Sequence, residues 1–247
     1  MRAARANGHL VLLCTGRPRS LLSGKVLRAG FDGLVLGAGC QVVVGDEVLA
    51  DRRFPDHLAD RVRSVLDRHD AAYVLESPEA VYGRPGVDAR LLRLIETVLR
   101  PAGLEEGGPH DILEALVMTD GLDGHSFGKA VFFDSPVSGA VLADELGEAV
   151  HVERSSIPGM GDSAGEVSVA GVHKALGLRE VVEHLGLSRA DVVAVGDGPN
   201  DIDMLEYAGL GVAVEGADAA LLAVADRTVP GPAQAGVATL FEELGLV

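Results

Sequence analysis

Hydrophobic positions in this chain come in short continuous runs, which alternate with segments of helical pattern. Continuous apolar runs that end at Gly, Pro or Asp are typical of strands buried on both faces of a parallel sheet. Strands that alternate with helices predict a doubly wound parallel α/β sheet, Rossmann-like in type. The runs are "HLVLLC" (9–14), "GLVLGAG" (33–39), "DVVAVGDG" (191–198), "GLGVAVEG" (209–216) and "DRTVP" (226–230), and the predicted helices of this part are 18–27, 200–208 and one at the C-terminus.

The middle of the chain, 46–162, has a different pattern. It is rich in Gly and Pro turns such as "GRPG" and "SIPGMGDSAG". Helical and strand-like pieces alternate in it, which predicts an inserted α+β domain, with 1–45 and 163–247 forming the domain that carries it. The predicted helices are 56–69, 88–99 and 138–147, and the strand-like pieces are "AAYVLE", "AVFF" and "EAVHVE".

The amino-acid composition excludes some classes of binding partner and indicates the compartment. Hydrophobic residues make up 47% of the chain and aromatic ones 4%, so the core must be aliphatic. The net charge of −16 argues against nucleic acid or an anionic membrane as a partner, because both require a basic surface. Two cysteines and no long apolar run favour a reducing compartment and no membrane span. We therefore expect a soluble, cytoplasmic protein.

Two carboxylates follow one of the apolar runs at the end of its predicted strand. Asp197 ends the run "VVAVG", where open α/β sheets bind ligands, and Asp201 falls in the first turn of the next helix. Two carboxylates with water molecules suit Mg²⁺, which takes its remaining ligands from a phosphate. The alternative is that Asp197 only shapes the turn and Asp201 only complements the start of the helix.

A hydroxyl and a lysine could complete an anion site. Thr15 ends the first run beside Gly16, which allows close backbone approach before a helix. Lys174 opens the helix before the Asp197 strand, and its ammonium suits a phosphate. The alternatives are a helix-capping threonine and a solvated surface lysine. Cys14 is no nucleophile of the C-x5-R type, because Ser20 stands at the arginine position.

Taken in order, "LLCTGRP", "GAGC", "EVSVAGVHKALGL", "VVAVGDGPNDIDMLEYAGLGVAVEGA" and "ADRTV" resemble the haloacid dehalogenase-like (HAD) superfamily. The resemblance is closest to its Cof-type phosphatases with a type IIB cap, and it spans essentially the whole chain. It implies that the insertion is a cap that closes over the site and selects the leaving group. The Asn-Gly-Ala expected after the second strand is Ala38-Gly39-Cys40 here, which removes an amide near the site.

The resemblance also implies roles for individual residues. Thr15 would bind the transferring phosphoryl group and Lys174 would neutralise its charge. Asp197, with Asp201 assisting, would hold Mg²⁺. Further phosphate- or substrate-binding positions would be Gly16, Arg17 and Asn200.

The nucleophile of the resembled family is missing from its expected place. It is the first Asp of a D-x-D-G-[TS] motif on a central strand, and only "MRAARANG", which has the pattern of a helix end, precedes the first run here. Without that strand, two sheet edges would remain unpaired across a gap. We therefore expect that the native protein begins further upstream and that residues 1–247 alone are inactive. "VFFDSP" and "TDGLDG" are poor substitutes, because their context or spacing differs.

Three functions follow from this interpretation. The first is a Mg²⁺-dependent phosphatase that hydrolyses a small phosphorylated metabolite, such as a sugar phosphate, through an aspartyl phosphate in the full-length parent. The second is a non-catalytic protein that keeps a phosphate and metal pocket. The third is a phosphomutase of the same fold, which dependence on a sugar bisphosphate would reveal.

Overall fold

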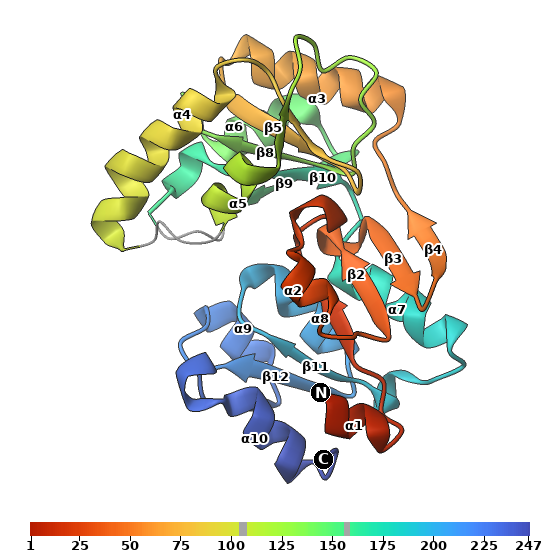
Figure 1. Cartoon of the computed structure of the whole chain (residues 1–247). Coiled ribbons are helices and arrows are strands. Elements are labelled where there is room, and N and C mark those ends of the chain that lie inside the picture. The colour runs from red at the N-terminus through yellow and green to blue at the C-terminus, as the bar shows by residue number, and fades with distance from the viewer. Residues whose placement is uncertain (104–107, 156–158) are drawn as a thin grey trace. The chain divides into compact units, whose positions relative to one another are not determined.

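The structure is a computed structural model that describes residues 1–103, 108–155 and 159–247 (Figure 1). The chain divides into two compact units: Met1–Gly16, Ser23–Asp51 and Val172–Val247 form the first, and Arg17–Leu22 and Arg52–Gly171 form the second. The main segment of the second unit, Arg52–Gly171, overlaps the predicted insertion 46–162 but begins and ends later, and Arg17–Leu22 joins it from the part of the chain before the insertion. Within the described part of the chain, no helix is long and apolar enough to cross a membrane.

The strands of the first unit form two separate hydrogen-bonded sheets. In one, β1 and β2 are parallel and β3 and β4 continue antiparallel. In the other, β11, β12 and β13 are all parallel, as predicted. The apolar patterning does not predict the β3–β4 hairpin. The strands are β1 Leu12–Cys14, β2 Gly33–Leu36, β3 Gln41–Val44, β4 Glu47–Asp51, β11 Val193–Gly196, β12 Leu210–Val214 and β13 Arg227–Val229.

The helices of this unit are short. The predicted helix 18–27 is wrong as one element, because Leu22 and Ser23 are extended between a 3₁₀ turn and α2. Ser23 caps α2 by accepting a hydrogen bond from the Val26 amide, which starts a new helix there. The helices are α1 Arg2–Ala6, α2 Gly24–Leu27, α7 Lys174–His184, α8 Ile202–Tyr207, α9 Ala219–Val224 and α10 Gly236–Glu243, with 3₁₀ turns at Gly37–Gly39, Arg189–Asp191, Pro199–Asp201 and Pro232–Gln234.

Helix α7 packs against both sheets of the first unit. Its Val181 packs with Val35 and Val42 of the first sheet. Its Val182 packs with Ala194 of the second sheet. Among the described residues no ladder pairs β1 with β11, so each of these strands is the end of its sheet. A shared helix, rather than a continuous row of strands, holds the two sheets in one unit.

The second unit is built on one mixed sheet of strand order β7-β6-β5-β8-β10-β9. Neighbouring residues of β5 point to opposite faces: Tyr73 packs under α3 and α6, and Val74 packs under α4 and α5. The predicted helices 56–69, 88–99 and 138–147 correspond to α3, to α4 with the π-helical turn after it, and to α6. The elements are α3 Asp56–Arg68, β5 Ala72–Glu76, β6 Val81–Gly83, α4 Val87–Leu94, a π turn Ile95–Leu99, 3₁₀ turns Arg19–Leu21, Arg100–Ala102 and Gly161–Ser163, α5 Gly108–Ala115, β7 Leu116–Met118, β8 Lys129–Phe133, α6 Gly139–Leu146, β9 Val150–Arg154 and β10 Gly165–Val169.

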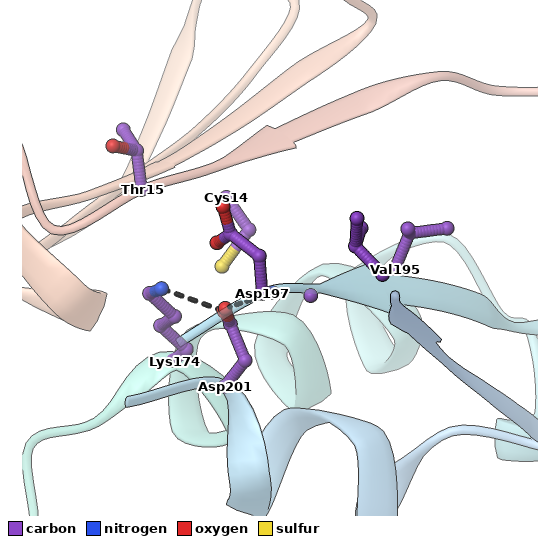
Figure 2. Close-up of a pocket in the computed structure, with 8 residues that line it drawn as sticks. Cys14, Thr15, Lys174, Val195, Asp197 and Asp201 are labelled. Carbon is purple, nitrogen blue, oxygen red and sulfur yellow. Dashed lines mark hydrogen bonds and ion pairs between the residues drawn. The ribbon is translucent and has the colours of Figure 1, made fainter. Parts of the chain in front are cut away.

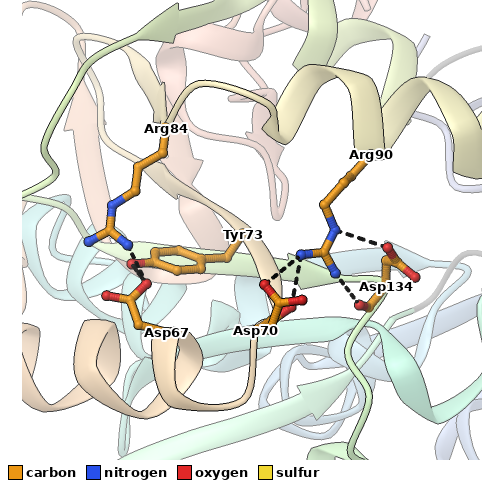
Figure 3. A network of polar contacts seen from close by, with 6 residues as sticks. All are labelled: Asp67, Asp70, Tyr73, Arg84, Arg90 and Asp134. Atoms are coloured by element: carbon orange, nitrogen blue, oxygen red, sulfur yellow. Dashed lines mark hydrogen bonds and ion pairs between the residues drawn. The ribbon is translucent and has the colours of Figure 1, made fainter.

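An arginine of α4 connects two turns at the ends of the central strands β5 and β8 (Figure 3). Arg90 donates to the backbone carbonyls of Asp70 and Asp134, each at 2.8 Å, and to the Asp134 carboxylate at 3.0 Å. Asp70 and Asp134 both have a left-handed backbone, with φ of 51° and 53°, which is strained for a residue other than glycine. The arginine therefore stabilises two unfavourable turns, one before β5 and one after β8.

Candidate active site

A pocket of about 210 Å³ lies where strands of both sheets of the first unit end (Figure 2). One wall comes from the end of β1, and the opposite wall comes from the end of β11 with its following loop. The start of α7 contributes a lysine. The lining residues are Cys14, Thr15, Lys174, Val195, Gly196, Asp197, Asp201 and Val214. The structure thus brings together Thr15, Lys174, Asp197 and Asp201, four positions that the sequence singles out.

Lys174 and Asp201 form a buried ion pair at the base of this pocket. The ammonium lies 2.6 Å from Asp201 Oδ1 and 2.7 Å from Asn200 Oδ1, and donates a hydrogen bond to each. Both charged side chains are almost inaccessible, with 6% and 5% exposure. Lys174 opens α7, where a cation is unfavourable for the helix dipole, so the carboxylate compensates the charge at this end. Asn200 is not in the pocket lining, but it contacts the pocket through Lys174.

Asp201 also shapes the loop that carries Asp197. Its Oδ2 accepts hydrogen bonds from the amides of Asp197 and Gly198, both at 3.1 Å. The contact needs glycine at 196, because a Cβ there would lie 2.5 Å from the Asp201 Cβ. The turn Pro199–Asp201 brings the carboxylate back under the loop. Glycine is therefore required before Asp197 because a larger residue would clash with Asp201.

Asp197 differs from Asp201 in its surroundings. Its side chain is exposed at the pocket wall, and within the described residues its carboxylate makes no hydrogen bond or ion pair. No group of three or more His, Cys, Asp and Glu side chains in the described part of the chain could hold a metal ion. A single open carboxylate fits Mg²⁺ all the same, because this ion keeps several waters and shares phosphate oxygens.

The β1 wall is fixed through its backbone. The Thr15 amide donates to the Val35 carbonyl at 2.9 Å, and the Thr15 carbonyl accepts from the Ala38 amide at 3.0 Å. Beside it, burial raises the pKa of the Cys14 thiol to about 12, although Lys174 acts in the opposite direction. A thiol with so high a pKa stays protonated at neutral pH and is a poor nucleophile. Cys14 therefore lines the pocket but is not its nucleophile.

The remaining predicted positions lie outside the pocket lining. Arg17 belongs to the second unit, where it forms an ion pair with Asp111. Gly16 follows Thr15 in the first unit. Asp134, weighed as a substitute nucleophile, is held by Arg90 in the second unit. Sequence reasoning missed the apolar lining residues Val195 and Val214, although both end predicted strands at the edge where ligands are expected.

Comparison with known proteins agrees with the resemblance. A sequence model described as haloacid dehalogenase-like hydrolase matches residues 1–241. A phosphoglycolate phosphatase of Archaeoglobus fulgidus is 40% identical over 104 residues, which are 40% of this chain and 47% of that protein. A 5-amino-6-(5-phospho-D-ribitylamino)uracil phosphatase of Bacillus subtilis is 33% identical over 110 residues, 44% of this chain and 40% of that protein. The chain thus matches less than half the length of these relatives.

Solved structures extend the likeness to the whole chain. A HAD subclass IIB sugar phosphatase superposes with a TM-score of 0.78 over 100% of this chain and 89% of that one, at 19% identity. A HAD phosphatase of Bacteroides thetaiotaomicron does so with a TM-score of 0.77 over 100% and 85%, at 24% identity. At such identities the likeness shows the fold, and the predicted HAD fold is confirmed. Together with the family match over nearly its full length, this shows that the chain belongs to the haloacid dehalogenase-like hydrolases.

Proposed function

We propose that the pocket of the first unit binds Mg²⁺ and the phosphate group of a small phosphorylated metabolite, and that the natural protein hydrolyses this phosphate ester. One observation carries the proposal: a hydroxyl, an ammonium and an open carboxylate line one pocket at the carboxyl ends of β1 and β11. Such an edge is where open α/β sheets bind ligands. The relatives named above act on phosphoglycolate and a phosphoribitylamino-uracil, which favours a substrate of this size.

The side chains divide the work by their chemistry. Thr15 donates a hydrogen bond to a phosphate oxygen, and Gly16 lets the backbone approach the anion closely. Lys174 neutralises part of the phosphate charge. Asp197 holds Mg²⁺, which when bound supplies positive charge to the phosphate. Without a cation the charged side chains that line the pocket would repel an anion, because the two carboxylates of Asp197 and Asp201 oppose the one ammonium of Lys174.

The nucleophile is the part of this proposal for which the described residues offer no side chain in the pocket. The resemblance assigns it to an Asp on a strand between those of Thr15 and Asp197. In the described residues β1 and β11 have no such strand between them, and only Asp197 and Asp201 bring carboxylates to the pocket. Asp201 forms an ion pair with Lys174. In this proposal Asp197 binds the cation, so neither carboxylate is available as the nucleophile. We therefore propose that residues 1–247 alone bind phosphate and Mg²⁺ without turnover.

The test compares two proteins on the same substrates. Residues 1–247 and the protein isolated from its own cells, with its intact mass measured, are assayed for release of phosphate from phosphoglycolate and sugar phosphates. We expect Mg²⁺-dependent turnover from the protein isolated from its own cells but not from residues 1–247 alone, and loss of that turnover in Asp197→Ala. Turnover that survives Asp197→Ala would contradict the metal assignment. Turnover by residues 1–247 would contradict the inactivity.

A second function is also compatible with the absence, among the described residues, of a strand between β1 and β11. If the natural protein has the mass of these 247 residues, the phosphate and cation pocket without a nucleophile fits a binding protein. Such a protein would bind inorganic phosphate in the presence of Mg²⁺ and release none from an ester. Cooperative unfolding of residues 1–247 would support this alternative, and molten behaviour would contradict it.

A further inference from the structure

The six-stranded sheet of the second unit ends in two edge strands of different character. β9 carries His151, Glu153 and Arg154, and charged side chains of this kind keep an edge from pairing with another chain. β7, at the other end of the sheet, is Leu116–Met118 and has no charged residue. We propose that β7 is a docking edge, to which an extended peptide with basic side chains adds as a further strand. None of its residues lines the pocket, so this inference is independent of the proposed function.

The backbone of β7 has hydrogen-bonding groups on its outer side. β7 is parallel to β6, with Gly83 opposite Met118, and the Thr119 amide donates to the Gly83 carbonyl at 2.9 Å. Alternate residues of a strand bond to the same neighbour, so the amide and carbonyl of Met118 are directed away from β6, as are those of Leu116. Among the described residues no strand pairs with β7 on that side. These backbone groups can therefore pair with an added strand.

Apolar side chains of this edge are exposed on both faces of the sheet. Val117 is 45% exposed and Met118 is 41% exposed. Because neighbouring side chains of a strand point to opposite faces, an added strand would cover Val117 on one face and Met118 on the other. The edge therefore fits a partner that has apolar side chains at two neighbouring positions.

The charge around β7 determines which partner fits. Glu114 precedes β7 and Asp120 follows it, both are exposed, and neither forms an ion pair with another described residue. The arginine that follows β6, Arg84, already forms an ion pair with Asp67. Two antiparallel β7 strands would bring Glu114 of one copy toward Asp120 of the other, and the whole chain has a net charge of −16, so a second copy is an unfavourable partner. Lysine or arginine on both sides of an apolar pair would complement the two acidic residues.

Binding of short labelled peptides to residues 1–247 tests the docking edge. The probe is the peptide Lys-Thr-Val-Val-Thr-Lys, and its control has glutamate in place of both lysines. Fluorescence anisotropy measures the two affinities at low and at higher salt. We expect the lysine peptide to bind at least about tenfold more tightly than the glutamate peptide, with a preference that decreases as salt is added. Equal binding of the two peptides, or no binding of the lysine peptide, would overturn the proposal.

N-methylation of the lysine peptide separates strand addition from attraction between charges alone. Methyl groups on alternate amides leave one edge of the peptide free to pair with β7, whereas methyl groups on all amides block both edges. We expect the alternately methylated peptide to bind within about threefold of the parent and the fully methylated one to bind at least about tenfold more weakly. A fully methylated peptide that binds like the parent would show attraction without strand pairing and would overturn the proposal.

Variants of the protein test whether the peptide binds at β7. Met118→Lys adds a positive charge to the docking edge, and Val48→Lys is the matched control on the edge strand β4 of the first unit, where Val48 is 56% exposed. We expect Met118→Lys to lower the affinity at least about tenfold and Val48→Lys to leave it unchanged, with circular dichroism as the check of folding. The double variant Glu114→Gln with Asp120→Asn should reduce the preference for lysine over glutamate. A folded Met118→Lys that binds like wild type would overturn the proposal.

Hydrogen exchange of the unaltered protein gives a measurement that depends on no variant. We expect the Leu116 and Met118 amides to exchange more slowly when the lysine peptide is added, because they would then donate to the added strand. Slower exchange at β9 or β11 in place of β7 would overturn the proposal. Self-association of residues 1–247 that slows exchange of the same two amides without peptide would overturn it in favour of a second copy as the partner.

Discussion

Two lysines of this chain are buried, and they serve in different ways. Lys174 of the first unit lies 2.6 Å from Asp201 at the base of a pocket. Lys129 of the second unit lies 3.1 Å from Glu76 and 2.8 Å from Glu166 within a sheet. Both lysines are almost fully buried, with 5% and 4% exposure, so burial alone does not separate them. The two lysines differ in their surroundings: each has two carboxylates nearby, and in the pocket one of these carboxylates is exposed.

Each cluster has one carboxylate more than it has lysines. In the sheet, burial raises the pKa of Glu76 against the opposing effect of Lys129, so this carboxyl group binds a proton more readily than an exposed glutamate does. In the pocket, the Asp197 carboxylate is exposed and makes no hydrogen bond or ion pair among the described residues, so its charge is accessible to a cation. The excess carboxylate sealed in the sheet therefore has a structural setting, whereas the one at the pocket wall is accessible to the cation that we propose.

The largest effect is expected from Lys129→Met. It leaves Glu76 and Glu166 without the ammonium between them, and removing one partner of a buried ionic cluster costs about 3–5 kcal/mol. Urea unfolding at pH 7 measures the loss, with exposed Lys25→Met as the control that should change little. A loss below about 1 kcal/mol would show that the ion pairs of Lys129 contribute little to stability, and the comparison between the two clusters would fail.

A second effect tests how dry the base of the pocket is. Because burial raises the pKa of Cys14 from its usual 9.0 to about 12, this thiol should react with iodoacetamide at pH 8 roughly a thousandfold more slowly than in the unfolded chain. Mass spectrometry of peptides follows the reaction. Alkylation at the unfolded rate would mean that water reaches the Lys174–Asp201 pair. The pair in the pocket would then no longer be comparable with the buried cluster of Lys129, Glu76 and Glu166.

A third effect concerns the charge of the pocket. Lys174, Asp197 and Asp201 together carry a net charge of −1, and Mg²⁺ would change this to +1. We therefore expect inorganic phosphate to bind residues 1–247 at least about tenfold more tightly with Mg²⁺ than without it, a difference of about 1.4 kcal/mol. Calorimetry measures both affinities. Lys129→Met, if folded, should leave the ratio unchanged, and Asp197→Asn should abolish it.

The sequence predicts the parallel strands and the pocket better than it predicts the contacts. Asp197 and Thr15 could be placed at one edge because apolar runs end there, and that rule depends on the chain alone. The ion pair between Asp201 and Lys174 could not, because it depends on where the Lys174 ammonium lies. Glu76, Lys129 and Glu166 carry no motif at all. Their strands lie far apart in the sequence and meet only through the pairing of β5, β8 and β10.

The smallest effect is a pH dependence that separates the interior cluster from the pocket. An acid whose pKa is raised by folding adds stability below its unfolded pKa, and this stability is lost as pH rises through the folded pKa. Glu76 is such an acid, because burial, opposed by Lys129 and Arg17 and aided by Glu166, raises its pKa from 4.5. The free energy of unfolding of wild type should therefore fall, relative to that of Glu76→Gln, as pH rises from about 4.5.

We expect this change to be on the order of 1 kcal/mol, measured by urea unfolding at about pH 4.5 and pH 8. Glu79→Gln is the matched control of opposite sign, because a hydrogen bond from Arg53 lowers the pKa of Glu79. That acid adds stability above its unfolded pKa and loses it as pH falls. The free energy of unfolding of wild type should therefore rise, relative to that of Glu79→Gln, as pH rises. Equal slopes for wild type and Glu76→Gln would mean that Glu76 stays ionised in the sheet. The interior cluster would then hold its excess charge as the pocket does, and exposure of Asp197 would be the one remaining difference between them.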